Sequence, residues 1–193
     1  MSAAEIYARF PQLETENLIL RRLSDTDAPA VLRIFGDDTV THYYDLDTFT
    51  DLAQAEELIE RFERRFAHQI GIRWGLARKS APDEIIGTCG YNIWIQDHDR
   101  AVVGYDLART YWRRGIMSEA LRQVVHFGFV EMGLNRIETP VFQDNAASRR
   151  LLEKLGFCEE GVLREYEFLK GRFIDLAMYS LLKKDWREIV SRT

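Results

Sequence analysis

Apolar residues recur at the spacing of an amphipathic helix in four stretches of the chain. The clearest is residues 51–68, where the apolar positions fall on one helical face. Capping residues before these stretches or glycines after them are typical of helix ends. The pattern predicts four main helices: residues 24–35, residues 51–68, the segment from Gly115 to Gly133, and the segment from Asn145 to Gly156.

Shorter apolar runs between turn signals predict seven strands, at residues 17–23, 73–79, 85–95, 100–108, 136–142, 157–169 and 172–182. The connections between residues 73 and 108 are too short for crossovers, so these strands should be antiparallel. The strand–helix–strand run over 100–142 is long enough for a parallel crossover. Residues 1–15, 37–50 and 183–193 are expected to be surface chain, a loop and a short tail.

The predicted class is therefore α+β, with a mixed, mostly antiparallel seven-stranded sheet flanked by four main helices. The order is strand, helix, helix, three strands, helix, strand, helix and two strands. With 193 residues, we expect a single domain over residues 1–193 with its core at about 15–186.

The net charge and the cysteine content limit the class of partner and the cellular compartment to be expected. The net charge of −5 argues against a nucleic-acid partner and suits an amine or a basic peptide as substrate. The two cysteines, Cys89 and Cys158, have no metal-ligand spacing and do not form a disulfide framework, so we expect a reducing cytoplasm. We expect no signal peptide, no membrane span and no metal site, because the four histidines are not at ligand spacing either.

A strand pattern meets a helix pattern at residues 107–120, and two arginines and a glycine stand at the junction. Arginine is unfavourable at a helix start, because the helix dipole already places partial positive charge there. Arg113 and Arg114 therefore indicate an anion, which Gly115 would let approach the backbone N–H groups. We expect a pyrophosphate cradle, and the alternative is an ordinary loop with two solvated arginines. Neither the Walker loop nor G-x-G-x-x-G is present.

Several motifs, together with the order of elements, resemble the GNAT superfamily of acetyl-CoA-dependent N-acetyltransferases. They are Trp112-Arg-Arg-Gly-Ile-Met117 before a helix, and Asn145-Ala-Ala-Ser148 before Glu153-Lys-Leu-Gly-Phe157. The C-terminal stretch over 161–182 is similar to the branch of Rim-type ribosomal-protein N-terminal acetyltransferases. Gly115 matches the central glycine of the superfamily's phosphate loop. Trp112 and Met117 depart from it, standing where Arg or Gln and Gly or Ala are usual.

The resemblance implies acetyl-CoA as cosubstrate, without a metal. The strand end at Leu107 would pair with the pantetheine arm, and a backbone N–H there would polarise the thioester carbonyl. Asn145 would bond the same arm or only cap its helix. The implied cofactor-binding residues are Leu107, Ala108, Arg109, Arg113, Arg114, Gly115, Ile116, Met117, Ser118, Asn145 and Ser148.

Two catalytic roles follow from the same resemblance. Ser148 aligns with a serine that protonates the leaving thiolate, and Glu167 aligns with a general base. The alternatives are helix capping for Ser148 and simple solvation for Glu167.

The implied reaction is direct attack by an amine, with the N-terminal amino group of a protein as acceptor. A small amine held by acidic residues such as Asp45 is the first alternative, and a non-catalytic acetyl-CoA-binding module is the second. A homodimer is possible.

Overall fold

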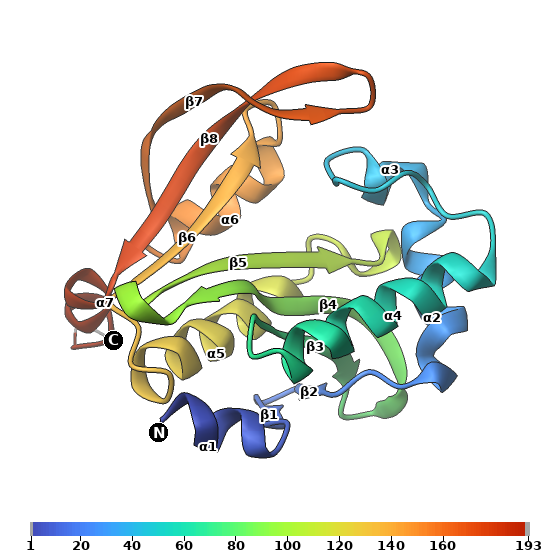
Figure 1. Ribbon diagram of the computed structural model, residues 1–193, viewed down its shortest axis with the longest axis horizontal. Helices are drawn as coiled ribbons and strands as arrows, with labels where there is room; N and C mark the ends of the chain where they lie inside the picture. Colours follow the sequence, from blue (N-terminus) through green and yellow to red (C-terminus); the bar gives the residue numbers. More distant parts are fainter. Residues whose placement is uncertain (1, 192–193) are drawn as a thin grey trace.

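The computed structural model describes residues 2–191, except for the side chain of Val190. Within this range, eight strands form one sheet in the order β1-β2-β3-β4-β5-β6-β8-β7 (Figure 1). Neighbouring strands run antiparallel, except that β5 and β6 are parallel. The strands are β1 Leu13–Glu14, β2 Leu18–Arg21, β3 Ile72–Arg78, β4 Ala81–Ile95, β5 Arg100–Leu107, β6 Arg136–Phe142, β7 Cys158–Leu169 and β8 Arg172–Leu182.

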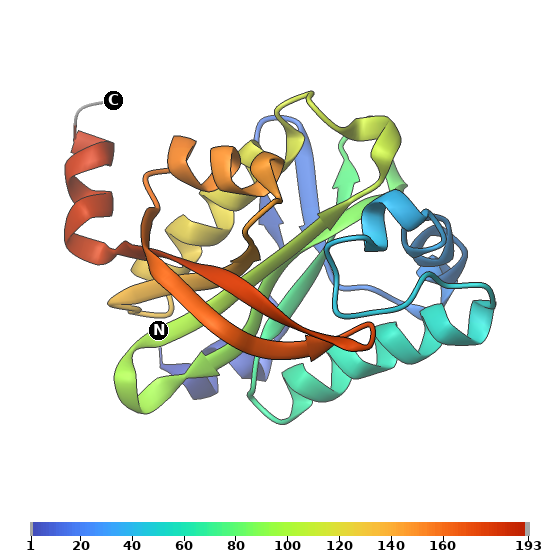
Figure 2. The same cartoon turned by 90° about the horizontal axis from the view of Figure 1, so that it is seen from above.

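Helices cover both faces of this sheet, with α5 and α6 on one side and α4 on the other (Figure 2). α5 and α6 share the larger apolar core with the middle strands, and α2 and α4 enclose a second apolar cluster. The α-helices are α1 Ala3–Ala8, α2 Ala28–Phe35, α3 Asp38–Thr41, α4 Leu52–Ala67, α5 Ile116–Val130, α6 Ala146–Lys154 and α7 Lys183–Ser191. The 3-10 turns are η1 Asp25–Asp27, η2 Gln96–His98 and η3 Arg109–Tyr111.

The predicted α+β class, the four main helices and the seven strands are confirmed, and the differences lie in the segments expected to be irregular. The first fifteen residues contain α1 and an eighth strand, β1, where Leu13 and Glu14 pair with Leu20 and Ile19. A capping box joins Ser2 and Glu5 at the start of α1. Six helical residues and two strand residues are too short to produce a readable period.

The predictions of an irregular tail over 183–193 and an irregular loop over 37–50 were also wrong. The tail folds as α7, where the Trp186 ring lies 5.2 Å from that of Phe129. The loop over 37–50 contains α3. β4 begins at Ala81, four residues before the prediction, with Pro82 inside it. Packing against distant partners decides the tail, and such partners leave no local pattern.

The sheet opens at its centre. β5 and β6 pair at three positions only: Arg100 with Arg136, Ala101 with Ile137, and Val102 with Glu138. Beyond them β5 continues along β4 to Leu107, while β6 follows β8 to Phe142, so the two strands diverge (Figure 1). One backbone edge of β5 after Val102 thus has no strand beside it.

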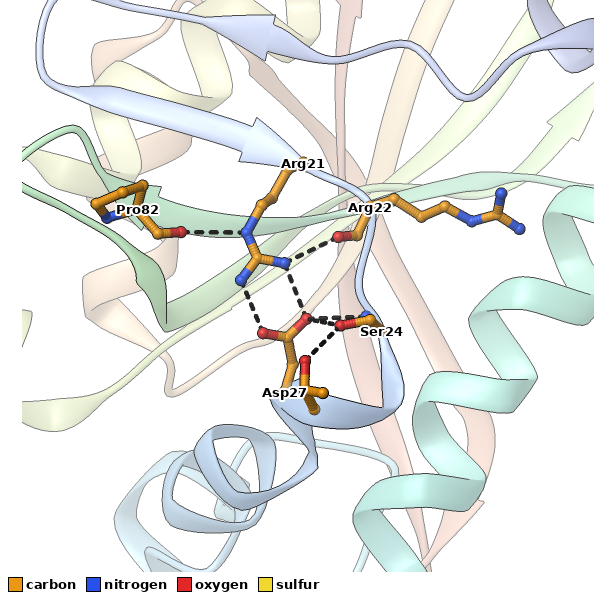
Figure 3. A network of polar contacts seen from close by, with 6 residues as sticks. Arg21, Arg22, Ser24, Asp27 and Pro82 are labelled. Carbon is orange, nitrogen blue, oxygen red and sulfur yellow. Dashed lines mark hydrogen bonds and ion pairs between the residues drawn. The ribbon is translucent and has the colours of Figure 1, made fainter.

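A polar network fixes the start of α2 on the sheet (Figure 3). The guanidinium of Arg21 on β2 donates to both carboxylate oxygens of Asp27, at 2.7 and 2.9 Å. Arg21 also donates to the carbonyl of Pro82, at 3.2 Å, and Asp27 accepts from the Ser24 N–H at 2.8 Å. Ser24 and Asp27 form a capping box, and the contacts of Arg21 with Asp27 and Pro82 join β2, β4 and the start of α2.

Replacing Asp27 by Asn should lower the free energy of unfolding by about 1–3 kcal/mol near neutral pH, because Arg21 loses its buried anionic partner. Burial raises the pKa of Asp27, but the hydrogen bonds from Arg21 and Ser24 outweigh it, and the pKa is lowered overall. A carboxyl whose pKa is lower in the folded state than in the unfolded state stabilises the folded protein at pH values above the unfolded-state pKa. This stabilisation is lost as the pH falls through the folded-state pKa.

Denaturant unfolding of wild type and Asp27→Asn across the acidic range measures this effect. The stability difference should be largest near neutral pH and shrink on acidification. Asp25→Asn, at an exposed position of the same turn, is the matched control and should stay near wild type. A difference that does not change with pH would contradict the assignment.

Candidate active site

A cavity of about 340 Å³ lies where β5 and β6 diverge. β5 and β6 line it on two sides, the start of α6 contributes a third wall, and the β7–β8 hairpin and the loop after α3 complete it. The polar side chains in its lining come from these elements, from β4 and from α4: Tyr43, Tyr44, Asp45, Arg65, Asn92, Tyr105, Thr139, Asn145, Ser148 and Glu167.

The free edge of β5 presents the backbone of Leu107. Ala108 donates its N–H to the Ile86 carbonyl on β4, at 2.8 Å. Backbone groups alternate in direction along an antiparallel ladder, so the N–H and carbonyl of Leu107 point away from β4, toward the opening. The carbonyl accepts the indole N–H of Trp112 at 2.7 Å. The Leu107 N–H therefore lies where a polarising donor was expected, and the Ala108 N–H is already engaged.

The loop before α5 has an unusual backbone. Arg113 has φ +60° and Gly115 has φ +78°, two left-handed residues separated by one. Such alternation turns successive N–H groups toward one side, which is the geometry of an anion-binding nest. A Cβ built on Gly115 meets nothing within 4 Å, so the space beside it is open.

The predicted cradle residues fall into two groups. Arg113, Arg114 and Gly115 are exposed at the loop, and the Arg114 guanidinium lies 5.6 Å from the Tyr111 ring centre. Met117 and Ser118 are buried in the first turn of α5. The Met117 side chain belongs to the core, so only its backbone is available to a ligand. Ile116 is half-buried and packs against the same core.

Two members of the predicted set have particular surroundings. The hydroxyl of Ser118 is buried without a hydrogen-bond partner among the described residues. Arg109 reaches away from the loop and donates to Thr39 Oγ1 in α3, at 3.3 Å. The structure therefore brings Arg109 to the α3 segment, whereas Ile116, Met117 and Ser118 form the first turn of α5.

The start of α6 carries both residues expected there. Asn145 Oδ1 accepts the Ser148 N–H at 3.1 Å, so Asn145 caps the helix as predicted. The Ser148 hydroxyl lies 2.5 Å from the hydroxyl of Tyr105 on β5. Sequence reasoning missed Tyr105, because a tyrosine within a strand pattern gives no signal of a partner 43 residues away.

A bulge aims Glu167 into the cavity. The pairing of β7 with β8 jumps from Leu163–Leu176 to Glu167–Ile174. The extra residues include Glu165, which has φ +49° and donates its N–H to Asp175 at 2.7 Å. Bulges redirect the side chains that follow them.

The surroundings of Glu167 disfavour the ionised form of its carboxyl. Burial raises the pKa of its carboxyl, and the negative charge of Asp45 raises it further. A carboxyl with a raised pKa, half-buried in a cavity, is suited to exchange protons and to bind a cation.

Beneath the cavity, the buried Arg73 on β3 connects several elements. It donates to Asp106 at 2.7 Å, to the Tyr44 hydroxyl at 3.0 Å and to Asn92 Oδ1 at 3.0 Å. Tyr44 and Asn92 line the cavity, so this guanidinium fixes part of its wall. Arg73 and Asp106 were not predicted, because a charged residue in an apolar strand looks like an outward-facing one until its partner is known.

The rim of the cavity is bridged. Lys170 at the tip of the β7–β8 hairpin donates to the Thr41 carbonyl in α3, at 2.7 Å. Tyr43 donates to the Asp144 carbonyl before α6, at 3.4 Å. The α3 segment thus contacts both the hairpin and the α6 entrance.

Residues 2–191 contain no cluster of three or more His, Cys, Asp or Glu side chains able to hold a metal ion. No helix among them is both long and apolar enough to cross a bilayer.

Two parallel strands diverge, and a helix N-terminus lies beyond one of them. This arrangement defines the fold class of the protein, and comparison with known proteins gives the same class. The family described as Acetyltransferase (GNAT) domain matches residues 17–158, and the chain belongs to it. The relatives named as N-acetyltransferases make it an enzyme rather than a non-catalytic binding module.

Individual relatives show which members of the family this chain is similar to. It is 44% identical to the uncharacterized N-acetyltransferase YoaA of Bacillus subtilis (strain 168), over 90% of this chain and 98% of that protein. It is 31% identical to the ribosomal-protein-serine acetyltransferase of Escherichia coli (strain K12), over 51% of this chain and 55% of that protein. The structure of RimL, a ribosomal L7/L12 α-N-protein acetyltransferase in complex with coenzyme A, has the same fold. It superposes with a TM-score of 0.78 at 19% identity, over 89% of this chain and 98% of that one. The resemblance to the Rim-type branch is confirmed.

Trp112→Phe should loosen the loop before α5, because it removes the only N–H of that side chain and leaves the Leu107 carbonyl without this donor. We expect a loss of about 1 kcal/mol in the free energy of unfolding and faster amide exchange over residues 108–115. Hydrogen exchange read by mass spectrometry measures it. Trp186→Phe, whose ring packs on Phe129, is the control and should leave this loop unchanged. Equal exchange over residues 108–115 in both variants would show that the hydrogen bond from Trp112 to Leu107 does not hold this loop.

Proposed function

We propose that this enzyme transfers the acetyl group of acetyl-CoA to the N-terminal amino group of a protein, acting in the cytoplasm. The observation that carries the proposal is the cavity between β5 and β6, where Glu167, Ser148 and the free edge of β5 meet. The overall charge of −5 also favours a cationic acceptor.

The chain's own features fit acetyl-CoA. The open space beside Gly115 and the two left-handed residues suit a pyrophosphate, and the partnerless Ser118 hydroxyl has a donor to offer it. The free edge of β5 suits an extended amide chain, which would pair with it as an added strand. The residues that would hold acetyl-CoA are Leu107, Ala108, Arg113, Arg114, Gly115, Ile116, Met117, Ser118, Asn145 and Ser148. Arg109 of the expected set would contribute only its backbone, because its side chain donates to Thr39.

Bound acetyl-CoA supplies a thioester carbonyl. The Leu107 N–H donates to its oxygen, where negative charge develops as the amine attacks; one such donor is typically worth about 3–4 kcal/mol. Glu167 accepts the proton that the amine loses as the C–N bond forms, and later releases it to solvent. The Ser148 hydroxyl donates to the sulfur, which receives the electron pair of the breaking C–S bond.

Relatives support a protein acceptor, since one is named for ribosomal-protein-serine acetylation. Asp45 beside Glu167 in a cavity of about 340 Å³ favours a second candidate, a small amine. Thiol release with peptides that differ in their first residue, against polyamines and amino acids, separates the two. A kcat/KM about tenfold higher for a peptide supports the first, and the reverse result supports the second. Sedimentation tests the homodimer, which stays a prediction.

The phosphate cradle is tested by a matched pair of glycines. Gly115→Asp places a negative charge where the pyrophosphate should bind, so the affinity for coenzyme A should fall about tenfold or more. Aspartate tolerates the left-handed region better than most residues, so the variant should fold. Gly133 has φ +72° and equally open surroundings, at the far end of α5.

Gly133→Asp therefore carries a similar backbone cost and the same added charge, and it should bind coenzyme A as wild type does. Titration calorimetry measures both variants. Equal affinities in the two would remove the cradle.

The role of Glu167 is tested by charge removal. Glu167→Gln should lower kcat about 100-fold with little change in the KM for acetyl-CoA. Asp45→Asn removes one cause of the raised pKa of Glu167, so the acidic limb of the kcat/KM profile should move to lower pH. Steady-state kinetics across pH measure both effects. Turnover of Glu167→Gln within twofold of wild type would exclude it as the base.

A further inference from the structure

Two hydroxyl groups meet inside the cavity. Tyr105 reaches from β5 and Ser148 from the first turn of α6, and their oxygen atoms are 2.5 Å apart. Among residues 2–191, Ser148 is the one hydrogen-bond partner that Tyr105 Oη has. The proposed function assigns a hydrogen-bond role to Ser148 and leaves Tyr105 without one.

The direction of this hydrogen bond follows from what each oxygen can reach. A hydroxyl has one hydrogen to donate and can also accept. If Ser148 donated to Tyr105, the phenol hydrogen would have no acceptor among residues 2–191 in a largely desolvated place, which is unfavourable. If Tyr105 donates, its hydrogen is satisfied and the hydrogen of Ser148 is free to turn into the cavity. The second arrangement is the favoured one.

Tyr105 is also unable to act as the acid itself. Its burial raises the pKa of the phenol far above the ordinary value, so the phenol stays protonated. Even an unperturbed phenol, with a pKa of about 10, is a weaker acid than a thiol with a pKa of about 8.5. The net transfer of a proton to a thiolate would therefore be uphill from Tyr105, and more so from the less acidic serine, so both hydroxyls act through hydrogen bonds.

We infer that Tyr105 is a positioning residue for Ser148. Its phenol donates to Ser148 Oγ, and the serine hydrogen is thereby directed at the sulfur of coenzyme A as the C–S bond breaks. The inference rests on the proposed function for its coenzyme, but it is independent of which amine is acetylated.

The test compares coenzyme A with desulfo-coenzyme A, in which hydrogen replaces the thiol. The two share every contact except those to sulfur, so the ratio of their affinities isolates the sulfur contact. In wild type the preference for coenzyme A should grow to about tenfold as rising pH ionises the thiol, because hydrogen bonds to charged groups are stronger. Titration calorimetry gives both affinities without any acceptor.

Tyr105→Phe removes only the hydroxyl, and Ser148→Ala keeps the backbone N–H that Asn145 accepts. Each should abolish most of the preference while leaving the affinity for desulfo-coenzyme A within about twofold, and the double variant should be no worse than Ser148→Ala. Tyr91→Phe is the control. Tyr91 is a buried tyrosine of the neighbouring strand that donates to the Val124 carbonyl at 2.8 Å, and its loss should lower Tm but leave the preference intact.

With an acceptor that wild type uses, kcat should fall about tenfold in Tyr105→Phe without a rise in the KM for acetyl-CoA. A wild-type preference in Tyr105→Phe, or effects of the two single variants that multiply in the double variant, would overturn the inference. If wild type prefers coenzyme A as expected but acetylates no amine, the proposed function fails and the positioning role stands.

Discussion

The divergence of β5 from β6 is the constraint on which the rest depends. Buried backbone N–H and carbonyl groups need partners, and the β5 edge beyond Val102 lacks a strand to supply them. β6 carries Pro140 in the part that β5 has left. A proline inside a fully paired strand would remove a ladder hydrogen bond, and it is tolerated where one edge is free. The opening therefore leaves an edge suited to an extended ligand, and a cavity beside it.

Charges buried under and around this opening hold its walls. The guanidinium of Arg73 is almost inaccessible and is paired with Asp106, which keeps β3 and β5 in one arrangement. The same guanidinium holds Tyr44, which comes from the loop after α3. That segment is in turn bound to the hairpin by Lys170. A continuous polar connection thus runs from the floor of the cavity to its rim. Removing Asp106 would leave the buried charge of Arg73 without its anionic partner, which is strongly destabilising.

Left-handed backbone conformations occur where chemistry is expected, as well as in ordinary turns such as those at Gln69 and Asp99. Arg113 and Gly115 flank the start of α5, and Glu165 lies in the bulge before Glu167. Left-handed non-glycine residues cost free energy and persist only when their surroundings enforce them. Here the enforcement is visible, since Asp175 accepts the N–H of Glu165 and Trp112 fixes the loop to Leu107. Glu165 thereby helps to orient the Glu167 carboxyl group toward the cavity, and Arg113 and Gly115 orient backbone N–H groups of the loop before α5.

The sequence alone determined the main helices and strands, because each has an apolar period long enough to read. It also determined the capping by Asn145, since this is a local consequence of residue type. Only the tertiary structure decided that Tyr105 meets Ser148, that Arg73 is buried rather than exposed, and that Lys170 spans the rim. These contacts join residues dozens of positions apart, and hydrogen bonding between such partners imposes no period and no composition on either segment. The physical reason is that periodicity records which face is buried, whereas a site depends on which faces meet.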